Sequence, residues 1–127
     1  MDELQQKIFF LDDDAERHKR FMMDRIGMNI TAVTNYADAC AALAKTKFDL
    51  AYLDHDLSEL AAAGRPAADE KTGTHVAEFI ATLPEEKRPK FVILHSFNDA
   101  GRRRMAAILN EVGVSCMIAP FGSNRFG

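Results

Sequence analysis

The residues best suited to chemistry in this chain are acids and histidines that stand in three short groups, each directly after an apolar run. The groups are Asp12 with Asp13, Asp54 with His55 and Asp56, and His95 with Ser96 and Asn98. Crowded carboxylates repel one another, and a bound cation or a raised pKa on one of them relieves the repulsion. Aspartate oxygens are hard ligands, which suit Mg²⁺ or Mn²⁺ better than zinc. We therefore expect Asp12, Asp13 and Asp54 to bind a divalent metal.

The histidines add acid–base chemistry to the expected metal site. His55 and His95 lack the spacing of a zinc-enzyme motif, but each stands beside acids and can exchange a proton with a phosphate ester at neutral pH. Ser96 and Asn98 can hydrogen-bond phosphoryl oxygens. Asp56 has two readings of equal weight, a catalytic acid and a solvated turn residue. The catalytic candidates are Asp54, His55, Asp56 and His95, and the phosphate-binding candidates are Ser96 and Asn98.

Other polar residues near these groups are expected to have structural roles. Asp14 is predicted to cap the helix that follows it. His18 and His75 fall on predicted helices, where we expect surface or packing residues rather than catalysts. The three arginines at 102–104 are expected on the solvated face of a helix, from which one of them could reach the site.

The elements that must position these groups alternate along the chain between strand and helix. Apolar runs without polar alternation predict strands buried on both faces of a sheet. Apolar residues at helical spacing, bounded by capping residues and glycines, predict helices. The expected strands span residues 7–11, 29–33, 48–53, 90–94 and 114–119. The expected helices span residues 14–26, 36–47, a segment that starts at Thr72 or Thr74 and ends at residue 83, and residues 98–112. Residues 57–73 are expected to form a loop or to carry a turn of helix.

This alternation predicts an α/β fold, a doubly wound five-stranded parallel sheet with right-handed crossovers and helices on both faces. In such a sheet the ligand site lies outside the carboxyl ends of the strands. Each of the three polar groups follows a predicted strand. We therefore expect all three groups to meet at one edge of the sheet.

The composition limits the class of protein. The chain has 127 residues, which predicts one domain over residues 1–127. Its formal net charge is −3, so no broad nucleic-acid surface is expected. No apolar run is long enough to span a membrane, and the start of the chain lacks the pattern of a secretory signal, which favours a cytoplasmic protein. Cys40 and Cys116 form no CxxC pair and predict reduced thiols in the core.

With these residues in place, the chain resembles a receiver domain, the fold of two-component response regulators, over nearly its whole length. FLDDD resembles the receiver acid pair at Asp12 and Asp13, and FDLAYLD puts Asp54 at the phosphoacceptor position. VILHS puts Ser96 at the receiver Ser/Thr position. In APF, Ala119 stands where a receiver has the lysine that neutralises the phosphoryl group. The resemblance implies the strand order 2-1-3-4-5, with the fifth helix of that fold missing.

Two further motifs, LDHDL and HSFN, depart from the ordinary receiver pattern and resemble more closely the cyclic-phosphate-processing receiver domains. That resemblance implies a metal-dependent hydrolase of cyclic phosphates, such as those on nucleotides or at RNA ends. It implies Mg²⁺ or Mn²⁺ as the cofactor, and a small phosphorylated ligand or an RNA end as the partner. It also implies that four residues take part in the site beside the acids, namely His55, Asp56, His95 and Asn98.

Two other functions stay open from the sequence. One is a signalling receiver phosphorylated on Asp54, which Ala119 disfavours because a phosphoryl group would lose a counter-charge and a hydrogen bond of roughly 1.5–3 kcal/mol. The other is a module that binds a nucleotide or a protein without turnover.

The missing fifth helix would leave one face of the sheet short of cover. Uncovered apolar surface costs about 25 cal/mol per Å², so we expect something to pack beside the first helix and the fifth strand. The expected arrangement is a homodimer or a stable complex with another protein, with Phe121 or Phe126 at the contact.

Overall fold

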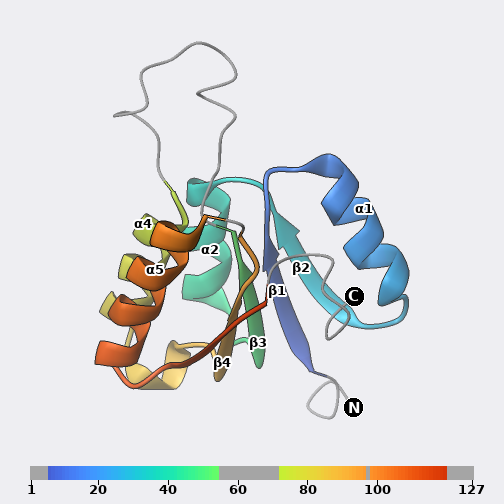
Figure 1. Ribbon diagram of the computed structural model, residues 1–127. Coiled ribbons are helices and arrows are strands. Elements are labelled where there is room, and N and C mark those ends of the chain that lie inside the picture. Colours follow the sequence, from blue (N-terminus) through green and yellow to red (C-terminus); the bar gives the residue numbers. More distant parts are fainter. Residues whose placement is uncertain (1–5, 55–71, 97, 120–127) are drawn as a thin grey trace.

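The computed structural model describes residues 6–54, 72–96 and 98–119 (Figure 1). Several of the expectations above concern residues outside these ranges: His55, Asp56, Phe121 and Phe126. The loop expected at 57–73 also lies outside them, apart from its last two residues. Thr72 caps the helix that begins at Gly73, which confirms Thr72 as its start over Thr74.

Five parallel strands form one sheet in the order β2-β1-β3-β4-β5, which confirms the predicted fold. The strands are β1 (Lys7–Leu11), β2 (Asn29–Val33), β3 (Leu50–Leu53), β4 (Phe91–Leu94) and β5 (Ser115–Ile118). β3, β4 and β5 are each one or two residues shorter than predicted, because their flanking residues are buried or paired without joining the ladder. Phe48, for example, is buried ahead of β3, and its carbonyl accepts a hydrogen bond from the Lys90 amide.

Four α-helices connect the strands within the described residues, and none of these helices follows β5. They are α1 (Ala15–Asp24), α2 (Tyr36–Lys45), α4 (Gly73–Thr82) and α5 (Asp99–Glu111), with a short 3-10 helix, η3 (Glu85–Lys87), before β4. Each α-helix begins after a polar cap whose side-chain oxygen accepts from a backbone amide of the first turn. Gly113, with φ +84°, follows α5 in the left-handed conformation that favours glycine.

The predicted end of the first helix was wrong. α1 stops at Asp24, before the predicted last residue Ile26, and Ile26 is 84% exposed instead of forming part of an apolar stripe. Phe21 is the one buried residue of α1. Ile26 lies in the turn after the helix, between the C-cap Arg25 and Gly27, so it cannot continue a stripe on the face of α1.

The helices form two unequal layers, with α2, α4 and α5 on one face of the sheet and α1 on the other (Figure 1). The larger core cluster lies beneath the three helices and includes Phe9, Leu53 and Leu94. A smaller cluster lies on the face of α1 and includes Phe10 and Phe21. None of the helices in the described part of the chain is long and apolar enough to cross a membrane.

Candidate active and metal-binding site

Three carboxylates meet where β1 and β3 end. Leu11 of β1 pairs with Leu53 of β3, so the residues that follow them, Asp12 and Asp54, stand side by side. The Asp54 amide donates to the Leu11 carbonyl at 3.1 Å. Asp12 is fully buried, Asp54 is 4% exposed, and Asp13 is half-buried. The structure thus brings together the three predicted metal ligands, with one oxygen of each within 4.8 Å of the others.

Arg17 lies among these carboxylates, although the sequence analysis did not single it out. Its Nε donates to Asp12 Oδ2 at 2.7 Å and its Nη2 to Asp12 Oδ1 at 2.9 Å, which is a bidentate pair. The same Nη2 is 3.6 Å from Asp54 Oδ2 and 3.9 Å from Asp13 Oδ1. The hydrogen bond to Asp12 raises the pKa of Arg17 above its usual value, which keeps the guanidinium charged.

His95 enters the site from the end of β4. Its Nε2 is 2.9 Å from Asp12 Oδ2, and its ring stacks on Phe10 with 5.2 Å between centroids and 10° between planes. The side chain is 3% exposed. Of the two histidines assigned to catalysis, His95 therefore contacts the acid cluster directly, while His55 lies outside the described residues.

The pKa shifts of Asp12 and His95 indicate which of the two groups is charged at pH 7. Burial raises the pKa of Asp12, but the hydrogen bonds from His95, Arg17 and a backbone amide outweigh burial, and the net pKa is lowered. Burial lowers the pKa of His95, and the Asp12 hydrogen bond only partly opposes this effect. Asp12 is thus ionised and His95 neutral at pH 7. Since an ionised carboxylate can only accept, His95 Nε2 carries the proton and Nδ1 carries the lone pair.

Ser96 and Asn98 lie beside His95, but their oxygens have structural partners. Ser96 Oγ accepts from the Asn98 amide at 3.0 Å, and Asn98 Oδ1 caps α5 by accepting from the Gly101 amide at 2.8 Å. The backbone carbonyl of Ser96 accepts from Arg102 Nη1 at 3.0 Å. Of the three arginines expected on a solvated face, Arg102 therefore instead turns toward the loop of the site.

Sequence reasoning missed the place of Arg17 and one contact of His18, both on α1. A helical side chain points back toward its N-terminus, so a residue in the first turn, such as Arg17, can return to the strand end before it; that was the available signal. His18, expected to be a surface or packing residue, packs edge-on against Phe10, and its Nε2 also contacts the Asp12 carbonyl. His75 is structural as expected, since its Nδ1 accepts from the Thr72 amide in the capping box of α4.

The donor set fits a hard divalent cation. Three carboxylates against one guanidinium leave an excess of two negative charges, which a divalent cation would balance. All the acidic donors are oxygens, as Mg²⁺ and Mn²⁺ prefer.

The parallel sheet in the order β2-β1-β3-β4-β5, with clustered acids after β1 and β3, defines a receiver domain of the response-regulator type. A family model for the cyclic-phosphate processing receiver domain matches residues 7–111, from the start of β1 to the end of α5. The chain belongs to this family. No curated protein matches it in sequence.

Solved structures with the same fold include response-regulator receivers. TrrA from Thermotoga maritima, in complex with Mg²⁺ and BeF, aligns with a TM-score of 0.64 and 18% identity over 95% of this chain and 92% of that chain. A CheY-like receiver from Methylobacillus flagellatus aligns at 0.62 and 16% identity, over 94% and 89%. A Burkholderia pseudomallei response regulator with a phosphorylated aspartic acid, calcium ion and citrate aligns at 0.61 and 13%, over 94% and 62%. At these identities the likeness is one of fold.

Proposed function

We propose that this receiver domain is a metal-dependent hydrolase of cyclic phosphates, of the 2′,3′-cyclic class found on nucleotides and at RNA ends. The observation that carries the proposal is the contact between His95 and the acid cluster, 2.9 Å from Nε2 to Asp12 Oδ2. An acid–base group and a cation site side by side suit phosphodiester hydrolysis. The family to which the chain belongs supports the same substrate class.

Asp12, Asp13 and Asp54 would hold Mg²⁺ or Mn²⁺, which when bound acts as a Lewis acid toward phosphoryl oxygens. In the reaction a water oxygen bonds to phosphorus, one ring P–O bond breaks, and the leaving ribose oxygen takes up a proton. His95 Nε2 faces the acid cluster, 2.9 Å from Asp12 Oδ2, so the ring is placed to exchange a proton with a group bound there. His55, next to Asp54 in the chain, is the second acid–base candidate, and Asp56 is the further catalytic acid.

The test is a screen of 2′,3′-cyclic nucleotides with Mn²⁺ or Mg²⁺, read by phosphorus NMR. We expect a ring-opened phosphomonoester, and His95→Ala should lower its rate of formation by roughly 10²–10⁴-fold, the usual contribution of one general acid or base. His75→Gln, changed in the α4 capping box, is the matched control and should turn over like the wild type. Absence of hydrolysis across the screen would contradict the proposal.

A signalling receiver phosphorylated on Asp54 is the second candidate. Asp54 is 4% exposed at the end of β3, and one structural neighbour carries a phosphorylated aspartic acid. Incubation with acetyl phosphate followed by mass measurement separates the two candidates, since a signalling receiver would gain about 80 Da on Asp54 and the hydrolase would not. A module that binds without turnover would show binding in calorimetry and no product in the screen.

A further inference from the structure

The proposed metal site is negatively charged, although its ligand, a phosphate, is an anion. Three carboxylates with one divalent cation keep a net negative charge, which repels a phosphate. Among the described residues, Arg17 is the cationic side chain whose ion pairs reach all three carboxylates of the site. Its charge brings the loaded site to neutrality.

The hydrogen-bonding capacity of Arg17 is only partly used. A guanidinium has five N–H donors, and Asp12 takes one from Nε and one from Nη2. Nη1 is 4.0 Å from Asp14 Oδ2, beyond hydrogen-bonding distance, and takes no part in the hydrogen bonds between described residues. The side chain is 28% exposed, so a ligand can approach it from solvent. Nη1 and the outer N–H of Nη2 form a fork that matches two oxygens of a phosphate.

The other arginine near the site has different partners. Arg102 Nη1 donates to the Ser96 carbonyl, and its Nη2 pairs with Asp99 at 3.1 Å. Its side chain is 14% exposed and supports the loop after β4. Arg17 therefore has both the position and the spare donors that a phosphate requires.

We propose that Arg17 is the phosphate-binding residue of this site, holding Asp12 through Nε and Nη2 while presenting Nη1 and Nη2 to two phosphate oxygens. This inference rests on the proposed function, since it assumes a cation among the three aspartates. It also makes Arg17 a competitor of that cation, because the guanidinium engages both oxygens of Asp12. Removal of Arg17 should therefore affect cation and anion binding in opposite directions.

The experiment measures two affinities by calorimetry in the full chain: Mg²⁺ alone, and inorganic phosphate at saturating Mg²⁺. Arg17→Met should bind Mg²⁺ about 10-fold more tightly, because a positive charge beside three carboxylates is gone. It should bind phosphate about 10- to 100-fold more weakly, the loss of hydrogen bonds to a charged group. Arg17→Lys keeps the charge without the fork, so it should bind Mg²⁺ like the wild type and lose part of the phosphate affinity.

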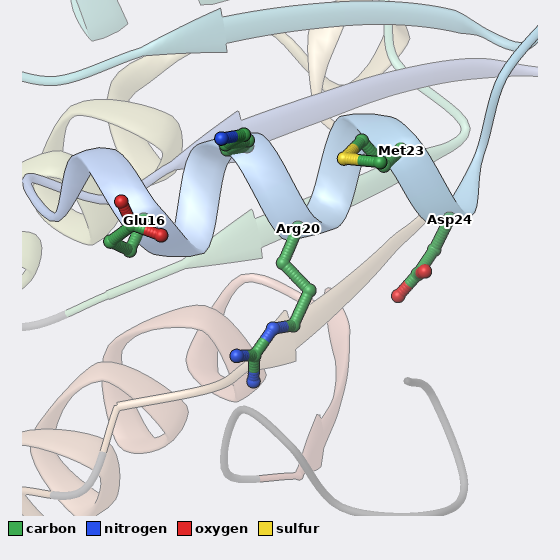
Figure 2. A pocket seen from close by; sticks show the side chains of 5 residues that line it. Glu16, Arg20, Met23 and Asp24 are labelled. Carbon is green, nitrogen blue, oxygen red and sulfur yellow. The ribbon is translucent and has the colours of Figure 1, made fainter.

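The matched control is Arg20→Met. Arg20 is exposed on the same helix and lines a surface hollow of about 300 Å³ with Glu16, Lys19, Met23 and Asp24 (Figure 2). It forms no ion pair with the described carboxylates of the site, so both affinities should equal those of the wild type. Circular dichroism establishes that each variant is folded, and Arg17→Lys carries the test if Arg17→Met is not.

The possible results separate the two proposals. Phosphate affinity unchanged in both Arg17 variants, with Mg²⁺ still bound, overturns the role of Arg17 and leaves the metal site standing. Failure of the wild type to bind Mg²⁺ overturns the proposed function and this inference with it. A parallel loss in Arg20→Met would show a general charge effect and would also overturn the inference.

Discussion

Asp12 is the residue on which the site depends. Its Oδ1 accepts from the Asp14 amide and Arg17 Nη2, and its Oδ2 accepts from Arg17 Nε and His95 Nε2. Four donors fill the usual capacity of a carboxylate. A cation must therefore share or displace one of these donors at Asp12.

Metal binding can be tested through stability. Mg²⁺ or Mn²⁺ should raise the melting temperature, since a ligand that binds only the folded chain stabilises it by mass action. Asp54→Ala should remove most of that rise. Asp49→Ala is the control, because Asp49 pairs with Lys7 and Lys90 ahead of β3, and it should keep the rise. Equal responses in the two variants would argue against the site.

The buried pair of Asp12 and His95 makes stability depend on pH. The pKa of His95 is lowered by burial, so below about pH 6.5 the unfolded chain takes up a proton before the folded chain does, and the free energy of unfolding falls. The pKa of Asp12 is also lowered, so the loss continues below about pH 4. In urea denaturation between pH 6.5 and 5, His95→Gln, which keeps an N–H donor, should lose less stability than the wild type. If the free energy of unfolding of the variant fell as much as that of the wild type, or more, over this pH range, the result would contradict this account.

Whether a residue of the site could be predicted from the sequence depends on the element that carries it. Asp12 and Asp54 directly follow strands, and the topology of a parallel sheet alone places such residues together. Arg17 stands on a helix, and its position among the acids depends on side-chain direction and on the packing of α1. From the sequence, Asn98 was a candidate both for phosphate binding and for helix capping. The structure shows that its Oδ1 caps α5.

At the scale of elements, the sequence predicted all five strands to within two residues. For β1, β3 and β4 the reason is that buried parallel strands have a continuous apolar pattern, whereas the edge strands β2 and β5 are largely exposed. The end of α1 could not be predicted in the same way. Met22 and Ile26 are four residues apart, at helical spacing, but both are exposed. Spacing predicts which residues share a face of a helix, and it does not predict how far the sheet extends beneath that face.

The cap of α5 gives a test at this scale. Asn98→Ala should lower the free energy of unfolding by about 1 kcal/mol, the usual cost of losing an N-cap, measured by urea denaturation. Asn98→Asp keeps an accepting oxygen and should stay close to the wild type. If both variants match the wild type, the hydrogen bond to the Gly101 amide contributes nothing measurable.

At the scale of the whole molecule, the described helices cover the two faces of the sheet unequally (Figure 1). Met117 of β5 pairs in register with Ile93, which belongs to the smaller cluster, yet Met117 is 37% exposed. We expect a second copy of the chain to pack on this face beside α1, and sedimentation at tens of micromolar should show a dimer. Met117→Lys should shift it to the monomer. Ile118→Lys, on the opposite face of the same strand, is the control, and a monomeric wild type would refute the expectation.

The single buried anchor of α1, Phe21, also bears on how the molecule moves. α4 buries five of its residues, while α1 buries one, so within the described part of the chain α1 is the helix that costs least to detach. Its amides should therefore exchange with deuterium through local opening, at a free energy below that of global unfolding, while those of α4 exchange only with the whole fold. Arg17 leaves the acids whenever α1 opens. A bound phosphate should consequently slow exchange in α1 before it slows exchange anywhere else.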